Sequence, residues 1–121
     1  MTKVVLTVDD SRTMRDMLRL TLREAGFAVA QAEDGAQGLD ALAEVDPDVI
    51  ITDINMPRLD GFGFIRGVRA DKRWRATPIL VLTTEADAQK KERARQAGAT
   101  GWIVKPFDPV RLVAAVRRVA G

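Results

Sequence analysis

A small set of acidic, hydroxyl and basic residues has the types and spacing that phosphate and metal chemistry require. Asp9 and Asp10 are adjacent, and Asp53, Thr83 and Lys105 each follow a separate run of apolar residues. Carboxylates that gather in one place repel one another unless a cation neutralises them. Since oxygen atoms are the available ligands, we expect a hard divalent ion of the magnesium type, with Lys105 and Thr83 completing a pocket for a phosphoryl group.

The composition excludes most other kinds of catalysis. The 121-residue chain contains no cysteine, histidine or tyrosine. These absences exclude disulfide scaffolds, zinc sites built from cysteine or histidine, haem bound by these residues, and nucleophiles activated by histidine. The net charge is +2 and the isoelectric point is about 9.4, because most of the basic residues are arginine. This balance does not indicate a nucleic-acid partner.

Five short apolar runs alternate with longer amphipathic segments and would position these residues. The runs have the β-branched content of strands buried on both faces, and the segments have the apolar spacing of helices. The predicted strands are 4–8, 27–32, 49–52, 79–82 and 101–104. The predicted helices are 12–25, 35–44, one that carries Phe64, Ile65 and Val68, 85–97 and 110–120.

Local signals at the segment ends support this division of the chain. Ser11 can cap the first helix, Gly26 and Gly98 stand where helices must end, and Pro109 stands at a helix start. Strands separated by helices throughout imply parallel pairing with right-handed crossovers, and therefore an open, doubly wound α/β sheet. We expect one domain over residues 1–121, with neither a linker nor an output domain.

The polar residues singled out above all follow predicted strands. The first strand ends in Asp9-Asp10, the third in Asp53, the fourth in Thr83-Thr84 and the fifth in Lys105. In open parallel sheets, ligands bind beyond the carboxyl ends of the strands, near the point where the strand order reverses. The sequence therefore predicts that these side chains form one site at that edge of the sheet.

Five segments, in order along the chain, resemble the receiver domain of response regulators. They are Val8-Asp9-Asp10-Ser11, Thr52-Asp53-Ile54-Asn55-Met56-Pro57, Asp60-Gly61, Leu82-Thr83-Thr84-Glu85 and Val104-Lys105-Pro106-Phe107. Any one of them is a weak signal, whereas five in register, covering essentially the whole chain, are a strong one. The resemblance implies a flavodoxin-like (βα)5 fold with strand order 2-1-3-4-5.

The resemblance also implies a role for each matching residue. Asp53 would be the phosphoacceptor, Lys105 would pair with the phosphoryl oxygens, and Thr83 would move to hydrogen-bond one of them. The implied Mg²⁺ ligands are Asp9, Asp10, Asp53 and the backbone carbonyl of Asn55. Asp9 would lie close to the ion and could bind it through water.

Further residues around the site would act in switching and tuning, namely Thr84, Glu85, Trp102 and Pro106. Thr84 would line the pocket, and Asn55 and Glu85 would help to set how fast the phosphate is lost. As an alternative, Asn55, Thr84 and Glu85 are surface polar groups. In relatives the Lys105–Pro106 peptide bond is cis.

Trp102 stands where receivers usually carry a tyrosine or phenylalanine that changes rotamer together with the threonine. An indole there is consistent with two interpretations, a half-buried cover for the last strand or a rotameric switch.

The segment from Gly101 to Phe107 resembles chemotaxis-type regulators in particular. This resemblance implies a cytoplasmic, monomeric phosphoaspartate switch of a two-component system. It would take its phosphoryl group from a sensor histidine kinase and then bind the flagellar motor switch, with a phosphatase as a possible further partner. It would not be an enzyme beyond its own phosphorylation and dephosphorylation.

We expect neither a membrane segment nor a nucleic-acid partner, and we interpret the basic residues around Trp74 as a solvated loop anchored by that side chain.

Three alternatives stay open at this point. The first is a single-domain receiver that serves as a phosphate sink or relay outside motility. The second is a metal-dependent phosphatase acting through an aspartyl phosphate, although the usual second carboxylate two residues after the nucleophile is replaced by Ser11 or Asn55. The third, a flavin- or nucleotide-binding protein, would require a glycine-rich loop where Asp9-Asp10-Ser11 stands.

Overall fold

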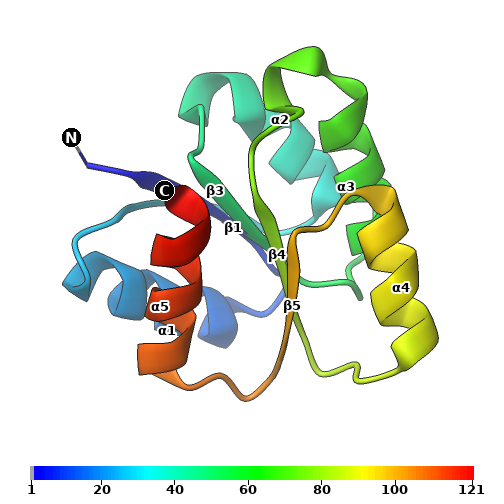
Figure 1. Ribbon diagram of the computed structural model, residues 1–121. Coiled ribbons are helices and arrows are strands. Elements are labelled where there is room, and N and C mark those ends of the chain that lie inside the picture. The colour runs from blue at the N-terminus through cyan, green and yellow to red at the C-terminus, as the bar shows by residue number, and fades with distance from the viewer. Residues whose placement is uncertain (1) are drawn as a thin grey trace.

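Five apolar segments form the strands of one parallel sheet. The computed structural model describes residues 2–121, and the sheet runs through the middle of this part of the chain (Figure 1). The strands are β1 (Val4–Val8), β2 (Ala28–Ala32), β3 (Val49–Thr52), β4 (Ile79–Thr83) and β5 (Gly101–Val104). They lie in the order β2-β1-β3-β4-β5, which confirms the predicted topology.

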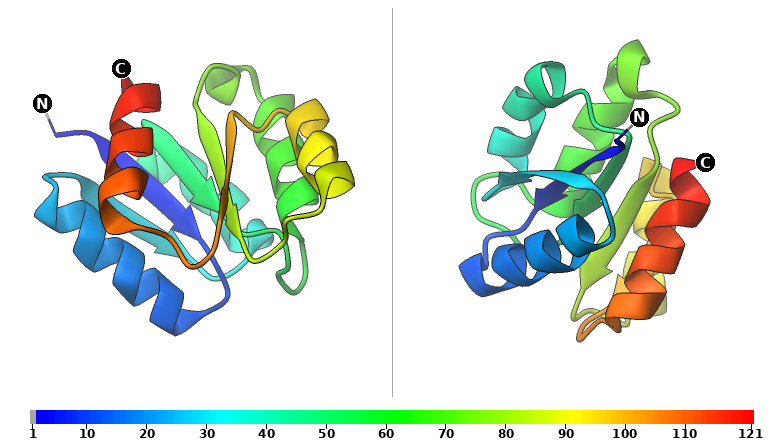
Figure 2. Two further views of the ribbon diagram at one scale, coloured as in Figure 1. Left: turned by 60° about the horizontal axis from the view of Figure 1, so that its bottom comes forward. Right: turned by 90° about the vertical axis from the view of Figure 1, so that its left-hand side faces the viewer.

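Helices cover both faces of the sheet (Figure 2). They are α1 (Arg12–Glu24), α2 (Gly35–Val45), α3 (Gly61–Ala70), α4 (Ala88–Ala97) and α5 (Pro109–Ala120), with one 3-10 turn, η1 (Lys72–Trp74). Helices α1 and α5 pack on one face, and α2, α3 and α4 pack on the other. In residues 2–121, no helix combines the length and apolar character that crossing a membrane would require.

A separate hydrophobic core lies on each face of the sheet. On one face, Leu18 and Leu22 of α1 pack with Leu112 and Val116 of α5 against β1, β3 and β4. On the other face, the largest fully buried side chain is Phe64 of α3, which packs with residues of the same three strands. The central strands are apolar on both sides because helices bury both sides.

A side-chain oxygen caps the first turn of each α-helix. The caps are Ser11, Asp34, Asp60, Asp87 and Asp108, and each accepts a hydrogen bond from a backbone N–H of the helix that follows. Such caps satisfy N–H groups that have no partner inside the helix. They also help to define where each loop after a strand ends and its helix begins.

Helix α4 begins later than the sequence pattern predicts. We expected it to start at residue 85, but the structure starts it at Ala88, with Asp87 as its cap. Glu85 stays in the loop because its N–H donates to the hydroxyl of Thr83 and its carbonyl accepts from Trp102. The contact with Trp102, 17 residues away along the chain, therefore overrides the helical pattern. Two other predicted elements extend one residue too far. Ala25 lies just after the end of α1, and Phe27 lies just before the start of β2.

The start of α3 lies against the end of β3 because residue 61 is a glycine. The N–H of Gly61 donates to the carbonyl of Ile54. A Cβ atom on Gly61 would clash with the carbonyl oxygen of Asp53, so no larger residue fits without a backbone shift. This close approach positions the loop that follows Asp53.

Candidate functional site

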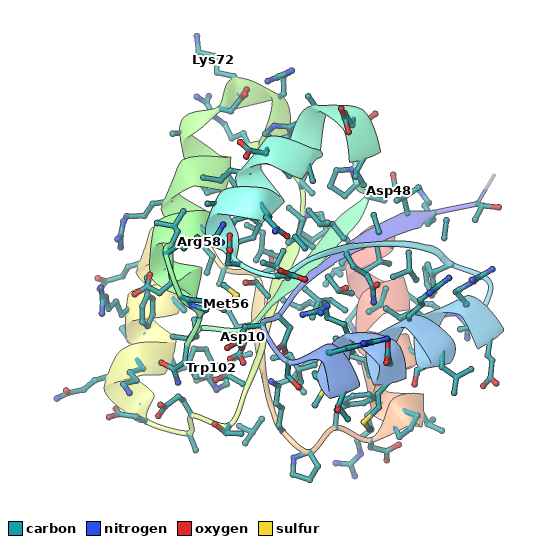
Figure 3. The ribbon with its side chains drawn as sticks, turned by 180° about the vertical axis from the view of Figure 1, so that it is seen from behind. Asp10, Asp48, Met56, Arg58, Lys72 and Trp102 are labelled. Carbon is teal, nitrogen blue, oxygen red and sulfur yellow. The ribbon has the colours of Figure 1, made fainter. Side chains whose placement is uncertain are left out.

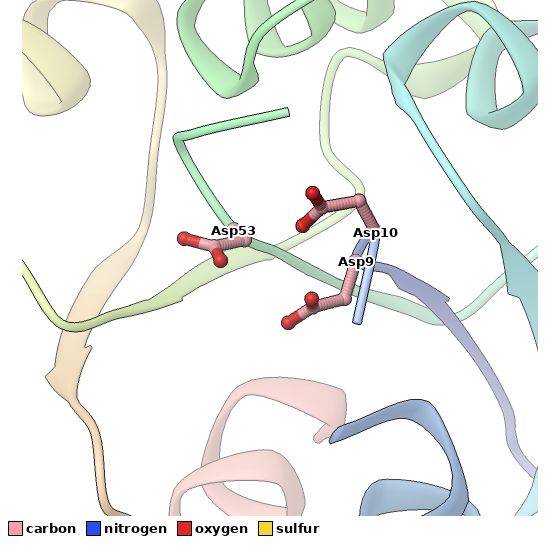
Figure 4. A group of neighbouring side chains, drawn as sticks. All are labelled: Asp9, Asp10 and Asp53. Carbon is pink, nitrogen blue, oxygen red and sulfur yellow. The ribbon is translucent and has the colours of Figure 1, made fainter. Parts of the chain in front are cut away.

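Three carboxylates meet beyond the carboxyl ends of two adjacent strands. Asp9 and Asp10 follow β1, Asp53 follows β3, and the register of these strands places Val8 beside Thr52. One oxygen from each carboxylate lies within 4.8 Å of the other two (Figure 4). Asp9 and Asp53 are buried, whereas Asp10 is exposed. The structure therefore brings together the acids that the sequence analysis grouped.

Lys105 reaches this cluster from the end of β5. Its Nζ donates to Asp9 Oδ2 and to Asp53 Oδ2, in both cases at 2.9 Å. The side chain is 10% exposed, so these two ion pairs are largely shielded from water. The next peptide bond, between Lys105 and Pro106, is cis, as the resemblance implied.

Burial and pairing act in opposite directions on these charges. Burial raises the pKa of Asp9 above its ordinary value, and this effect outweighs the N–H of Ser11 and the ammonium of Lys105, which both lower it. Burial by itself would lower the pKa of Lys105, but the hydrogen bonds and negative charges of Asp9 and Asp53 raise it overall. Lys105 therefore carries its positive charge at neutral pH, and Asp9 is an acid that a further cation would stabilise.

The carboxylate of Asp53 is held at both oxygens. Oδ1 accepts a hydrogen bond of 2.6 Å from the N–H of Ile54, and Oδ2 accepts from Lys105. Its backbone carbonyl accepts from the hydroxyl of the buried Thr52 at 2.8 Å. These contacts fix the orientation of the carboxylate, which a nucleophile needs for transfer to one particular oxygen.

Glu85 connects the loops around the acids. Its N–H donates to Thr83 Oγ1 at 3.3 Å, and its carbonyl accepts from Trp102 Nε1 at 3.1 Å. Its side-chain Oε1 accepts from Asn55 Nδ2 at 3.1 Å and lies 3.2 Å from the Nζ of Lys90. The hydrogen bond from Asn55 and then the ammonium of Lys90 hold the pKa of Glu85 below its usual range.

The remaining predicted residues lie around this edge of the molecule. Trp102 lies on the same side of the molecule as Asp10 in the view of Figure 3 and is half-buried, with its N–H bonded to the loop before α4. Thr84 and Pro106 are exposed. The contact between Lys90 and Glu85 was not predicted from the sequence. Nothing in the local pattern indicated that contact, because it depends on where α4 begins.

The donor set fits a hard divalent cation. Three carboxylates converge, one of them exposed, and the chain has neither the cysteine nor the histidine that softer metals prefer. Lys105 balances only part of this negative charge. A magnesium ion would be held by Asp10 and Asp53, with Asp9 beside it.

Comparison with known proteins gives consistent results. The family model of the response regulator receiver domain matches residues 5–117. The chain is 39% identical over 116 residues to the chemotaxis protein CheY of Pseudomonas aeruginosa, covering 95% of this chain and 94% of that protein. It is 40% identical over 109 residues to CheY-3 of Vibrio cholerae, covering 89% and 84% of the two chains.

Solved structures agree in fold and in sequence. The structure of CheY4 from Vibrio cholerae superposes with a TM-score of 0.94 at 44% identity, covering 98% of this chain and 99% of that one. The receiver domain of a sensor histidine kinase from Pseudomonas aeruginosa, solved with magnesium in its active-site cleft, gives a TM-score of 0.92 at 30% identity, covering 100% and 99%. The acid cluster, the strand order and these matches together show that the chain belongs to the response regulator receiver domain family and is of the CheY type.

Proposed function

We propose that this protein is a phosphoaspartate switch that accepts a phosphoryl group on Asp53 from a histidine of a partner kinase. The observation that supports the proposal best is the position of Asp53, whose carboxylate is oriented by Ile54 and Lys105 inside a cluster of acids. A free oxygen lone pair of Asp53 attacks phosphorus while the bond from phosphorus to the imidazole nitrogen breaks. The electron pair of that bond stays on the imidazole, which leaves neutral because its other nitrogen carries a proton.

The residues around Asp53 supply charge and orientation for this transfer. Lys105 already touches the attacking carboxylate and is positioned to pair with an oxygen of the incoming phosphoryl group. The hydroxyl of Thr83 at the end of β4 is the further donor that we assign to a phosphoryl oxygen. To reach it, the hydroxyl exchanges its present contact with the N–H of Glu85.

Mg²⁺ is the cofactor that we assign to Asp10, Asp53 and the backbone carbonyl of Asn55, with Asp9 beside it. When bound, the ion would offset the negative charge that develops as the phosphoryl group approaches the acids. A receiver relative holds magnesium in its active-site cleft, and the cluster in this chain offers carboxylate oxygens, which a hard ion such as magnesium prefers.

The output of the switch is a change in the surface formed by α4, β5 and α5. A phosphoryl group adds roughly −1.5 to −2 charges beside Lys105. Movement of Thr83 releases the N–H of Glu85, and Glu85 is joined to Trp102 on β5 and to Lys90 on α4. The local charge is thereby connected to the helix and the edge strand that a partner would contact.

We infer that the partner of the phosphorylated form is the flagellar motor switch, because the relatives described above are named as chemotaxis proteins. The protein would act in the cytoplasm as a monomer. Its chemistry would be limited to its own phosphorylation and dephosphorylation, with a phosphatase as a further partner.

Substitution of Asp53 tests the phosphoacceptor directly. Asp53→Asn is expected to abolish phosphoryl incorporation from a phosphorylated kinase or from acetyl phosphate, because the amide is a poor nucleophile. Incorporation is measured by phosphate-affinity gel electrophoresis, and Asp40→Asn, on the exposed face of α2, is the matched control. Normal labelling of Asp53→Asn at another aspartate would overturn the assignment.

The choice of partner needs a separate experiment. Binding to a flagellar switch protein is measured with and without beryllofluoride in the presence of Mg²⁺, and tighter binding with beryllofluoride is expected. Phosphorylation at Asp53 without such binding would favour a phosphate sink, and turnover of a phosphorylated metabolite would favour a phosphatase.

A further inference from the structure

Glu85 is the only carboxylate in the loop between β4 and α4 that faces the β3–α3 loop, and a single lysine of α4 holds it there. Asn55 and Lys90 approach the same oxygen, Oε1, at 3.1 and 3.2 Å. Asn55 is two residues after Asp53, so this contact places the Glu85 carboxylate beside the loop that carries the phosphoacceptor. Lys90 lies in the first turn of α4 and reaches back over the loop to meet it.

The charges at this edge of the sheet are unevenly matched. Four carboxylates lie here, from Asp9, Asp10, Asp53 and Glu85. Lys105 contacts two of them, Asp9 and Asp53, whereas Lys90 contacts Glu85. The cap of α4, Asp87, supplies another negative charge two residues after Glu85 in the same loop. Lys90 is therefore the residue that offsets the charge of Glu85 on the approach to Asp53.

We propose that Lys90 is a positioning residue for phosphorylation, which neutralises Glu85 and holds it beside Asn55 so that an anionic phosphodonor can approach Asp53. The proposal rests on phosphoryl transfer to Asp53, as described under the proposed function. Without Lys90, the carboxylate of Glu85 faces incoming anions uncompensated and loses one of its two side-chain contacts.

The effect of Lys90 should depend on the charge of the donor. With acetyl phosphate, the Asp53 oxygen forms a bond to phosphorus, and the bond between phosphorus and the acetate oxygen breaks, with its electron pair leaving on acetate. This donor is a dianion at neutral pH, whereas phosphoramidate is mainly a monoanion. The electrostatic effect of removing the Lys90 charge is proportional to the charge of the donor. Lys90→Gln should therefore slow phosphorylation by acetyl phosphate more than phosphorylation by phosphoramidate.

The first measurement is the initial rate of phosphorylation at saturating Mg²⁺ with each small donor. We expect Lys90→Gln to be slower by roughly three- to tenfold with acetyl phosphate and by less than about threefold with phosphoramidate. Lys90→Arg keeps the charge and should retain most of the wild-type rate. Lys72→Gln removes the same charge from η1, at the far end of the molecule from Asp10 and Trp102 (Figure 3), and should react like the wild type.

The second measurement separates an electrostatic role from local damage to the fold. Loss of the positive charge in Lys90→Gln should tighten Mg²⁺ binding, which is measured from the rise in melting temperature that Mg²⁺ causes. The same loss should slow phosphorylation by the anionic donor. A distorted site would weaken both. In the Glu85→Gln background, Lys90→Gln should slow phosphorylation by acetyl phosphate by a smaller factor than in the wild type, because Lys90 then has no carboxylate to neutralise and position, and only its direct effect on the donor remains.

Each result bears on one of the two proposals. A wild-type protein that takes no phosphoryl group on Asp53 would overturn the proposed function itself. A wild-type protein that is phosphorylated, together with Lys90→Gln that matches Lys72→Gln, would overturn the role of Lys90 alone. Equal slowing of both donors, weaker Mg²⁺ binding, or an undiminished effect in the Glu85→Gln background would do the same.

Discussion

At the scale of single residues, Asp9 shows how a functional site is maintained at the expense of stability. Its carboxylate is buried and accepts hydrogen bonds from the N–H of Ser11 and from Lys105, yet its pKa is still raised because burial outweighs both contacts. The folded state therefore favours the protonated form of Asp9. Protonation of Asp9 therefore stabilises the fold. This stabilisation is complete below the ordinary pKa of 3.8 and is lost as the pH rises through the raised pKa of the folded state.

Asp9→Asn should therefore stabilise the magnesium-free protein at neutral pH. The amide keeps an oxygen for the N–H of Ser11 and carries no charge, so we expect a melting temperature about 2–5 °C higher at pH 7. The difference should shrink as the pH falls through the raised pKa of Asp9 and vanish below the ordinary pKa of 3.8, where wild-type Asp9 is protonated in both states.

The measurement is thermal unfolding followed by circular dichroism in buffer with a chelator. Asp40→Asn removes an exposed acid and serves as the control, with a change close to zero. A lower melting temperature for Asp9→Asn at pH 7 would contradict the inferred cost of this buried charge.

At the scale of elements, Arg69 joins the end of α4 to the segment that enters β4. Its guanidinium donates to the carbonyl of Gly98 from both Nε and Nη2, and to the carbonyls of Trp74, Arg75 and Thr77 from Nη1. Burial lowers the pKa of Arg69. The charge is satisfied by backbone oxygens alone, which suits the planar guanidinium with its five donors. Helix α4 contributes only one buried residue, Ala94. The hydrogen bonds from Arg69 to the carbonyl of Gly98 are therefore a large part of what anchors the helix.

Arg69→Met should destabilise the fold by about 2–4 kcal/mol, because several partly buried carbonyls lose their donor at once. Arg69→Lys should recover little of this, since one ammonium cannot reach all four carbonyls. Both variants are compared by urea unfolding with Arg66→Met, an exposed arginine on the same helix. A loss below about 1 kcal/mol for Arg69→Met would contradict the anchoring role.

At the scale of the whole molecule, the acid cluster connects a bound cation to global unfolding. The ligands come from β1 and β3, which are neighbours at the centre of the sheet and contribute to both hydrophobic cores. A cation that binds there binds the folded chain and not the unfolded one. Its binding energy is therefore added to the free energy of unfolding of the entire domain.

Mg²⁺ should raise the stability of the protein by about 2.7 kcal/mol at a concentration one hundred times its Kd, with the dependence expected for one ion. Asp10→Asn should lose most of this rise, and excess chelator should reverse it in the wild type. Sodium chloride at matched ionic strength is the control. An equal rise with sodium chloride would show general screening and contradict a specific site.

Much of the fold and of the site could be predicted because it depends on local patterns. Apolar runs of four to six residues alternating with amphipathic segments indicate a parallel sheet, which the structure confirms. The strand order, also confirmed, was implied by the resemblance to receiver domains and not by these patterns. The acids could be grouped for the same reason, since the carboxyl ends of parallel strands meet at one edge. The start of α4 could not be predicted, because the carbonyl of Glu85 accepts a hydrogen bond from Trp102, a residue on β5 whose position relative to the loop only the tertiary structure defines.

The sequence by itself determined which residue types stand at the strand ends, and therefore that oxygen and ammonium groups carry any chemistry here. Only the tertiary structure decided how they pair. Lys105 is separated by 96 residues from Asp9 and by 52 from Asp53, and the contact with each depends on the packing of strands and loops. The same holds for Trp102 and Lys90, which meet at Glu85 from β5 and α4. Spacing along the chain defines the edge of the sheet on which a side chain stands, whereas packing defines the partner that it reaches.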